Sequence, residues 1–325
     1  MYAHKKYRQM LLKSIFPLGA LILLTLPAAA QTKPAQGLDF SLPKDGEKIE
    51  YDSEDMFGPT DGTDTSSEGE REFSTTWETR SGKRGTDDTT GLPGKGRYIV
   101  SAPQISVQYG VTDDFSVEVS AFGDLRNVKN VPGLDDNSLA SFDGFSTQFS
   151  YRFLERSREN PLGLGMSFEP RWSRIADTEG VRQDSFDGEL KWLADYRLMD
   201  GRLWFATNLG MDPQVGKTLA TGIFERQSTL TWSNALTARV LDTTFAGVEA
   251  HYSRSYNGFM PDQFLGQAIF VGPTLLHQFS KSASLKLSLS SQVWGHSHNP
   301  DFSGNRLDLF NFEQTTASAK LSLDF

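Results

Sequence analysis

The last stretch of the chain alternates between apolar and polar side chains. Phe325, Leu323 and Leu321 fall on one face, and Asp324 and Ser322 fall on the other. This period of two predicts a β-strand with one apolar and one polar face. A transmembrane barrel must pair its last strand with its first, because an open edge is costly in lipid. The pattern therefore favours a barrel, with the edge strand of a β-sandwich as the alternative.

The same alternation recurs through residues 69–325, where we expect twelve strands. Five connections are short, near residues 110, 157, 200, 242 and 281. Six are mostly longer, at residues 81–96, 124–142, 177–185, 213–223, 257–263 and 297–308. Short turns on one side, longer loops on the other and an even strand count are typical of outer-membrane barrels. The predicted fold class is all-β: a transmembrane antiparallel up-and-down β-barrel of about 12 strands.

The N-terminus has the three parts of a secretory signal peptide. Basic residues precede an apolar run at residues 15–24, and Ala28, Ala29 and Ala30 provide a small-residue cleavage site before Gln31. The run is short for a bilayer and contains Pro17, which disfavours a membrane-anchoring helix. We therefore expect residues 1–30 to be cleaved, and the mature chain to reach the outer membrane of a Gram-negative bacterium.

Composition excludes several other classes of protein. The chain has no Cys, so no disulfides can hold it together. Its mean hydropathy is −0.42, which is neutral here because half of each strand in a transmembrane barrel is polar. The net charge is −9 without a basic patch, so we expect no nucleic-acid partner.

Residues 31–68 form an acidic N-terminal segment on the periplasmic side of the predicted barrel. Residues 31–70 carry eleven acidic residues against three lysines and show no sustained period. Four of the acids could suggest a calcium loop, but their spacing does not match an EF-hand: Asp52, Asp55, Asp61 and Asp64. The segment is interpreted as a linker, with a short plug folded into the lumen as the alternative.

Aromatic residues cluster at both ends of the predicted strands, where girdles form at the two membrane interfaces. Those near the short turns are Tyr109, Phe115, Phe153, Tyr196, Phe245 and Phe325. Those near the long loops are Trp77, Trp172, Tyr256 and Trp294.

The polar face of each strand should point into the lumen, where charges must be hydrated or paired. Two charged clusters on neighbouring strands could form salt-bridge networks or a constriction. The candidate lumen residues are Glu169, Arg171, Asp187, Glu189, Lys191, Asp195, Arg197, Glu225, Arg239, Glu249 and His251. A hydrated lumen would form a channel, whereas a fully paired one would form a closed, structural barrel.

Lipid hydrolysis is the enzymatic alternative. His251 and Ser253 share one strand face, but by parity that face is the lumen, not the lipid boundary where a lipid hydrolase meets its substrate. We therefore assign no catalytic residue, and no cofactor or metal is predicted.

Several short segments resemble a family of uncharacterised proteobacterial outer-membrane proteins. They are residues 56–64, 69–72, 109–113, 266–268, 271–274 and 294–296. The family is treated as transporter-like or porin-like, so the resemblance implies a porin-like passive channel or transporter for small solutes. It also makes residues 56–72 less typical of a linker and implies docking of this segment at the periplasmic mouth or in the lumen as the alternative. Phe325, Leu323 and Leu321 resemble the C-terminal signal of outer-membrane proteins, which implies the barrel-assembly machinery and outer-membrane lipid as partners.

Overall fold

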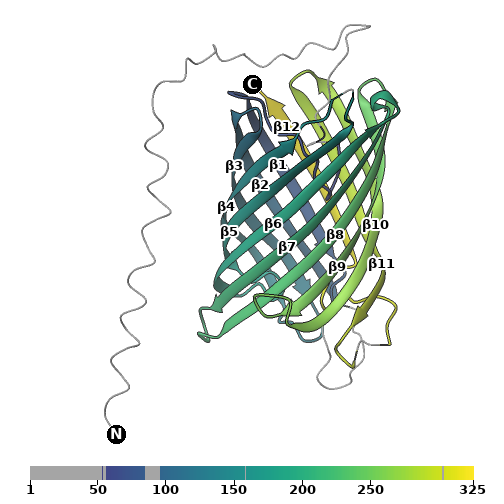
Figure 1. The fold of residues 1–325 in the computed structure, drawn as a ribbon. Coiled ribbons are helices and arrows are strands. Elements are labelled where there is room, and N and C mark those ends of the chain that lie inside the picture. The colour runs from purple at the N-terminus through teal and green to yellow at the C-terminus, as the bar shows by residue number, and fades with distance from the viewer. Residues whose placement is uncertain (1–52, 54–55, 85–95, 158, 302–303) are drawn as a thin grey trace, which may run out of the picture. The chain divides into compact units, whose positions relative to one another are not determined.

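The computed structural model describes residues 53, 56–84, 96–157, 159–301 and 304–325. The predicted signal peptide and residues 31–52 lie outside the described residues. Twelve antiparallel strands form a closed barrel in chain order (Figure 1), which confirms the predicted fold class. The strands are β1 (Arg71–Ser81), β2 (Arg97–Thr112), β3 (Phe115–Lys129), β4 (Asn137–Leu154), β5 (Leu162–Ile175), β6 (Arg182–Leu198), β7 (Leu203–Thr218), β8 (Phe224–Leu241), β9 (Thr244–Asn257), β10 (Gln263–Ser280), β11 (Ala283–Ser297) and β12 (Thr315–Asp324).

The barrel closes by pairing β1 with β12, as the terminal alternation predicted. The ladder runs from Glu72 opposite Asp324 to Ser81 opposite Thr315. Beyond it, the Phe325 N–H donates to the Arg71 carbonyl at 2.9 Å. Because both edges are used, the described strands leave no free sheet edge.

The five short turns occur where they were predicted, at the end of the barrel that also holds the C-terminus (Figure 1). One of them contains a short 3-10 helix, η3 (Met199–Gly201). Among the described residues, no helix is long and apolar enough to cross a bilayer.

Three loops are shorter than predicted, because the strands continue further toward the long-loop end. β3 runs to Lys129, β4 starts at Asn137, β6 starts at Arg182 and β7 runs to Thr218. At this end, part of the inner face is apolar, since Tyr98, Val100, Val128 and Val131 form a buried cluster. The rule of apolar outside and polar inside therefore fails at these ends of β2 and β3, so the sequence pattern does not predict the end of β3.

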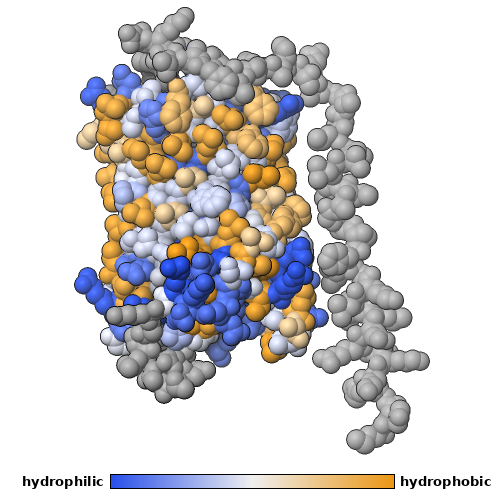
Figure 2. Space-filling model, turned by 180° about the vertical axis from the view of Figure 1, so that it is seen from behind, coloured by the Kyte–Doolittle hydropathy of each residue, from blue (hydrophilic) through white to orange (hydrophobic). Residues whose placement is uncertain are grey.

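Apolar side chains cover much of the outer wall of the barrel. Trp77, Trp192, Trp232 and Leu209 are each at least half exposed. Figure 2 shows this hydrophobic surface over the wall, with hydrophilic residues gathered toward the long-loop end. An apolar outside is what lipid requires of a barrel. Phe245 contradicts the predicted girdle, because it is fully buried inside the barrel.

Candidate functional site

The chain before β1 lies inside the barrel. We call residues 53 and 56–67 the lumenal segment. It contacts strands around the whole ring, which is possible only from the inside. Its partners include Gln108 on β2, Arg152 on β4, Asp195 on β6, Thr237 on β8 and Glu249 on β9.

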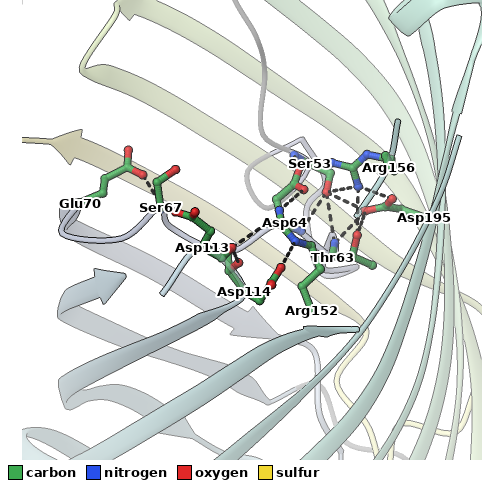
Figure 3. Close-up of polar contacts among 11 residues, drawn as sticks. Ser53, Thr63, Asp64, Ser67, Glu70, Asp113, Asp114, Arg152, Arg156 and Asp195 are labelled. Atoms are coloured by element: carbon green, nitrogen blue, oxygen red, sulfur yellow. Dashed lines mark hydrogen bonds and ion pairs between the residues drawn. The ribbon is translucent and has the colours of Figure 1, made fainter. Parts of the chain in front are cut away.

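The first anchor of the lumenal segment is Asp195, a predicted lumen residue that is 1% exposed. One carboxylate oxygen accepts hydrogen bonds from the Ser53 hydroxyl at 2.6 Å and from the Thr63 N–H at 2.7 Å. The guanidinium of Arg156 pairs with Asp195 and also with Asp64 (Figure 3). The cluster thus joins the segment, the β4–β5 turn and β6 in one network.

Arg156 lies in the short turn between β4 and β5, outside the strands. Burial would lower the pKa of its guanidinium, but the carboxylates of Asp64 and Asp195 raise that pKa above its usual value. The arginine therefore stays charged while it is buried. Arg152 adds a second link, since its Nη1 lies 3.3 Å from Asp64 Oδ1.

Next to Asp195, the wall of the barrel has a glycine, Gly163, where it faces the lumenal segment. A Cβ atom on Gly163 would lie 2.2 Å from the Thr63 hydroxyl and 2.7 Å from an Asp195 oxygen. No other residue fits that position without moving the segment. Glycine at this position of β5 therefore leaves room for the side chains of the anchor.

The second anchor is Glu249 on β9, another predicted lumen residue. Its carboxylate accepts the backbone N–H of Gly58 and, at 2.9 Å, the N–H of Thr60. It is 4% exposed. Hydrogen bonds to a charged group contribute about 1.5–3 kcal/mol each, so Glu249 stabilises the docked position of residues 58–60.

The third anchor is an apolar pocket inside the otherwise polar lumen. Met56 and Phe57 are 1% and 0% exposed. They pack in one buried cluster with residues of the wall: Trp204, Ala206, Ala235, Phe245 and Leu276. Full burial of each side chain contributes about 1.5–3 kcal/mol. Phe245 therefore serves this pocket and not a membrane interface.

Further contacts fill the space between the segment and the wall. Lys191 bridges Asp61 at 2.9 Å and Glu189 at 2.8 Å, and the Asn208 amide donates to the Asp61 carbonyl at 3.2 Å. Between the segment and strands β4 to β6 lies a cavity of about 30 Å³. That volume is enough for at least one water molecule, which needs about 10–15 Å³ on the same measure.

Beyond the segment, toward the long loops, three carboxylates lie in one row across β5, β6 and β7. Glu169 is directly opposite Glu189, and the same register puts Asp212 beside Glu189. Arg171, one step along, pairs in register with Asp187 and places its guanidinium 3.9 Å from the centre of the Phe122 ring. Lys191 neutralises one of these charges, at Glu189, and the other two carboxylates give this part of the lumen a negative bias.

The long-loop end is crossed by contacts from β1 and β3 to the β5–β6 loop. Arg126 on β3 donates to the carbonyls of Ala176 and Thr178 in the β5–β6 loop, at 3.2 and 3.3 Å. Arg80 on β1 pairs with Asp177 of the same loop at 2.7 Å. The loop must lean inward over the lumen to reach both strands.

Two predicted lumen residues lie away from any constriction. Glu225 is exposed near the long-loop end of β8, and Arg239 is exposed near its other end. Arg197 lies near the short-turn end, where it donates to the Ser157 carbonyl at 3.2 Å.

His251 and Ser253 both face the lumen. The His251 ring stacks on Phe270 with centroids 4.5 Å apart, and the Ser253 hydroxyl lies 3.3 Å from that of Thr231. Among the described residues, no hydrogen bond joins His251 to Ser253, and no three His, Cys, Asp or Glu side chains could hold a metal ion. The arrangement thus places His251 and Ser253 inside the barrel and not at the lipid boundary.

Sequence reasoning missed the partners of the anchors. Arg156, Ser53 and Thr63 were not singled out, because a turn arginine and two small hydroxyl residues carry no pattern. The available signal was the resemblance over residues 56–72, which set this part apart from a linker.

The sequence pattern of a family of unknown function, DUF6662, matches residues 49–325. No curated protein matches the chain. The COG4313 outer membrane channel from Pseudomonas putida F1 is a similar solved structure, with a TM-score of 0.54, 10% identity, and coverage of 81% of this chain and 98% of that one. The NanC porin gives a TM-score of 0.45 at 9% identity over 77% and 98% of the two chains, and the KdgM porin 0.41 at 9% over 78% and 99%.

Proposed function

The chain belongs to the DUF6662 family, whose function is unknown, and we propose that it is a channel for small polar solutes in the bacterial outer membrane. One observation carries the proposal: the barrel is closed, apolar outside and lined inside by charged and hydroxyl side chains. A polar interior in a barrel of this kind is suited to a water-filled path.

The proposed location follows from the same arrangement. Leu321 and Phe325 expose about two fifths of their surface on the outer side of the closing strand, where lipid would contact them. With Leu323 they are the residues we propose the barrel-assembly machinery reads. Deleting Phe325 should leave the protein unassembled in the periplasm, which fractionation of cells would detect.

The direct test is solute efflux from liposomes. The mature chain and a chain without residues 31–67 are each refolded into liposomes loaded with a small sugar and a large dextran. We expect loss of the sugar and retention of the dextran from at least one of the two preparations. Retention of both solutes in both preparations, with the barrel correctly folded, would contradict the proposal.

A non-conducting, structural barrel is the second candidate. It is favoured by the ion pairs inside the barrel, such as Lys320 with Glu72 at 2.9 Å, and by the contacts that cross the long-loop end. The same efflux experiment separates the two candidates, because a structural barrel would retain the sugar even without residues 31–67.

A further inference from the structure

We propose that the lumenal segment is a plug carried on the same chain, and that solutes pass only when it leaves the lumen. This inference rests on the proposed channel function. Its basis is geometric: the segment spans the barrel from wall to wall.

The span follows from the strand order. In a ring of twelve strands, β2 and β8 lie on opposite walls. The segment bonds to both: Ser66 accepts from Gln108 on β2 at 2.8 Å, and the Met56 carbonyl accepts from Thr237 on β8 at 3.4 Å. A chain anchored to opposite walls crosses the path that a solute would take.

The segment also fits its site closely. Its three anchors are of different kinds: an ion-pair cluster at Asp195, a carboxylate on backbone N–H groups at Glu249, and an apolar pocket around Phe57. A segment that lay in the lumen without a specific site would not meet all three kinds of anchor. The fit indicates a specific docked state.

All of these contacts are non-covalent, so the segment can leave the lumen without breaking a covalent bond. It joins β1 at Gly69, whose φ of +85° suits glycine. The junction lies beside the short β2–β3 turn, where the Gly69 N–H donates to the Gly110 carbonyl and the Glu68 N–H donates to Asp113, each at 2.9 Å. Release of these exposed hydrogen bonds, together with the three anchors, would free the segment toward the short-turn end while the ladders between the strands stay in place.

A disulfide lock on the full chain tests the plug. The natural chain has no Cys, so within one chain two introduced thiols can form a disulfide only with each other. Position 165 places the second thiol: a Cβ built on Gly165 lies 3.7 Å from the Thr63 Cβ, within the range of about 3.5–4.5 Å found in disulfides. It also lies 3.0 Å from the Tyr151 carbonyl oxygen, so the Gly165→Cys single variant controls for a small shift of the wall. The variant carries Thr63→Cys and Gly165→Cys, and each single substitution is a matched control.

Single-channel current is recorded from the double variant after oxidation, and again after a reductant is added. We expect the oxidised double variant to be closed, with openings at least tenfold rarer than in its reduced form. In the single variants, the frequency of openings should be the same before and after reduction. Equal conduction by oxidised and reduced protein, with the disulfide verified, would overturn the plug. Because the sugar-efflux experiment on the chain without residues 31–67 tests the channel alone, failure of the plug and failure of the channel give different results.

Discussion

Replacing Asp195 by Asn should release the lumenal segment without unfolding the barrel. The substitution keeps the shape of the side chain but removes the charge that pairs with Arg156. It also weakens the acceptor for Ser53 and Thr63, whose hydrogen bonds are 2.6 and 2.7 Å long. The wall of the barrel keeps its β5–β6 and β6–β7 ladders, because these involve only the backbone.

The expected magnitude follows from the burial of the cluster. Breaking a buried ion pair by removing one partner costs about 3–5 kcal/mol. Arg156 retains Asp64 as a partner, and Asn can still accept one hydrogen bond, so the lower end applies. Since about 1.4 kcal/mol corresponds to a factor of ten, the docking equilibrium should shift by about a hundredfold toward the released segment.

A buried thiol reports this equilibrium. Met56 is 1% exposed, so Met56→Cys should react with a maleimide only when the segment opens. In that background, Asp195→Asn should raise the labelling rate by about a hundredfold. The matched control is Glu72→Gln, which removes another buried lumenal pair, with Lys320. A labelling rate changed by less than about threefold in a folded Asp195→Asn barrel would refute the role of this anchor.

Three further predictions concern the apolar pocket, the carboxylate row and the β11–β12 loop. Phe57→Ala should weaken docking of the lumenal segment by about 3–5 kcal/mol, because it empties a fully buried pocket. The Met56→Cys thiol should then lose its protection from maleimide, and retained protection would count against the role of the pocket. Asp212→Asn should lower the preference for cations over anions, which the reversal potential in a KCl gradient measures; an unchanged reversal potential would show that the carboxylate row does not act on permeating ions. The β11–β12 loop docks against the barrel through Asp308, which is fully buried and whose backbone carbonyl accepts from Gln292 on β11 at 3.2 Å. Burial raises the pKa of the Asp308 carboxyl, so docking of this loop should strengthen as the pH falls from 7 toward the ordinary pKa of Asp, near 4. Asp308→Asn should abolish that pH dependence in proteolysis of the loop, and a persistent dependence would assign it to another group.

The barrel could be predicted from the sequence because its rule is local. Each strand must be apolar toward lipid and polar toward the lumen. The alternation that includes Leu321 and Leu323 therefore identifies the closing strand from its own residues. The same parity put Asp195 and Glu249 on the inner face, where they lie. The rule failed where the environment changed, as at Val100 and Val128, whose apolar side chains point inward beyond the lipid-facing part of the wall.

The docked segment could not be predicted in this way. Its residues have no period, because each one meets a different strand. Thr63 and its acceptor Asp195 are 132 positions apart, and Thr60 and Glu249 are 189 apart. Phe245 on the barrel wall shows the same limit of a local rule. Its place near a short turn predicts a membrane girdle, whereas its actual partners, Met56 and Phe57, lie far away in the chain.

The most direct test of the account compares single-channel currents of the mature chain and of the chain without residues 31–67, side by side in one planar bilayer system. The account predicts that the shorter chain is open for most of the recording, with steps that scale with salt, whereas the mature chain is closed for most of it. Identical open times and step sizes for the two chains would show that the segment does not close the lumen. Silence from both folded chains would show that the barrel does not conduct.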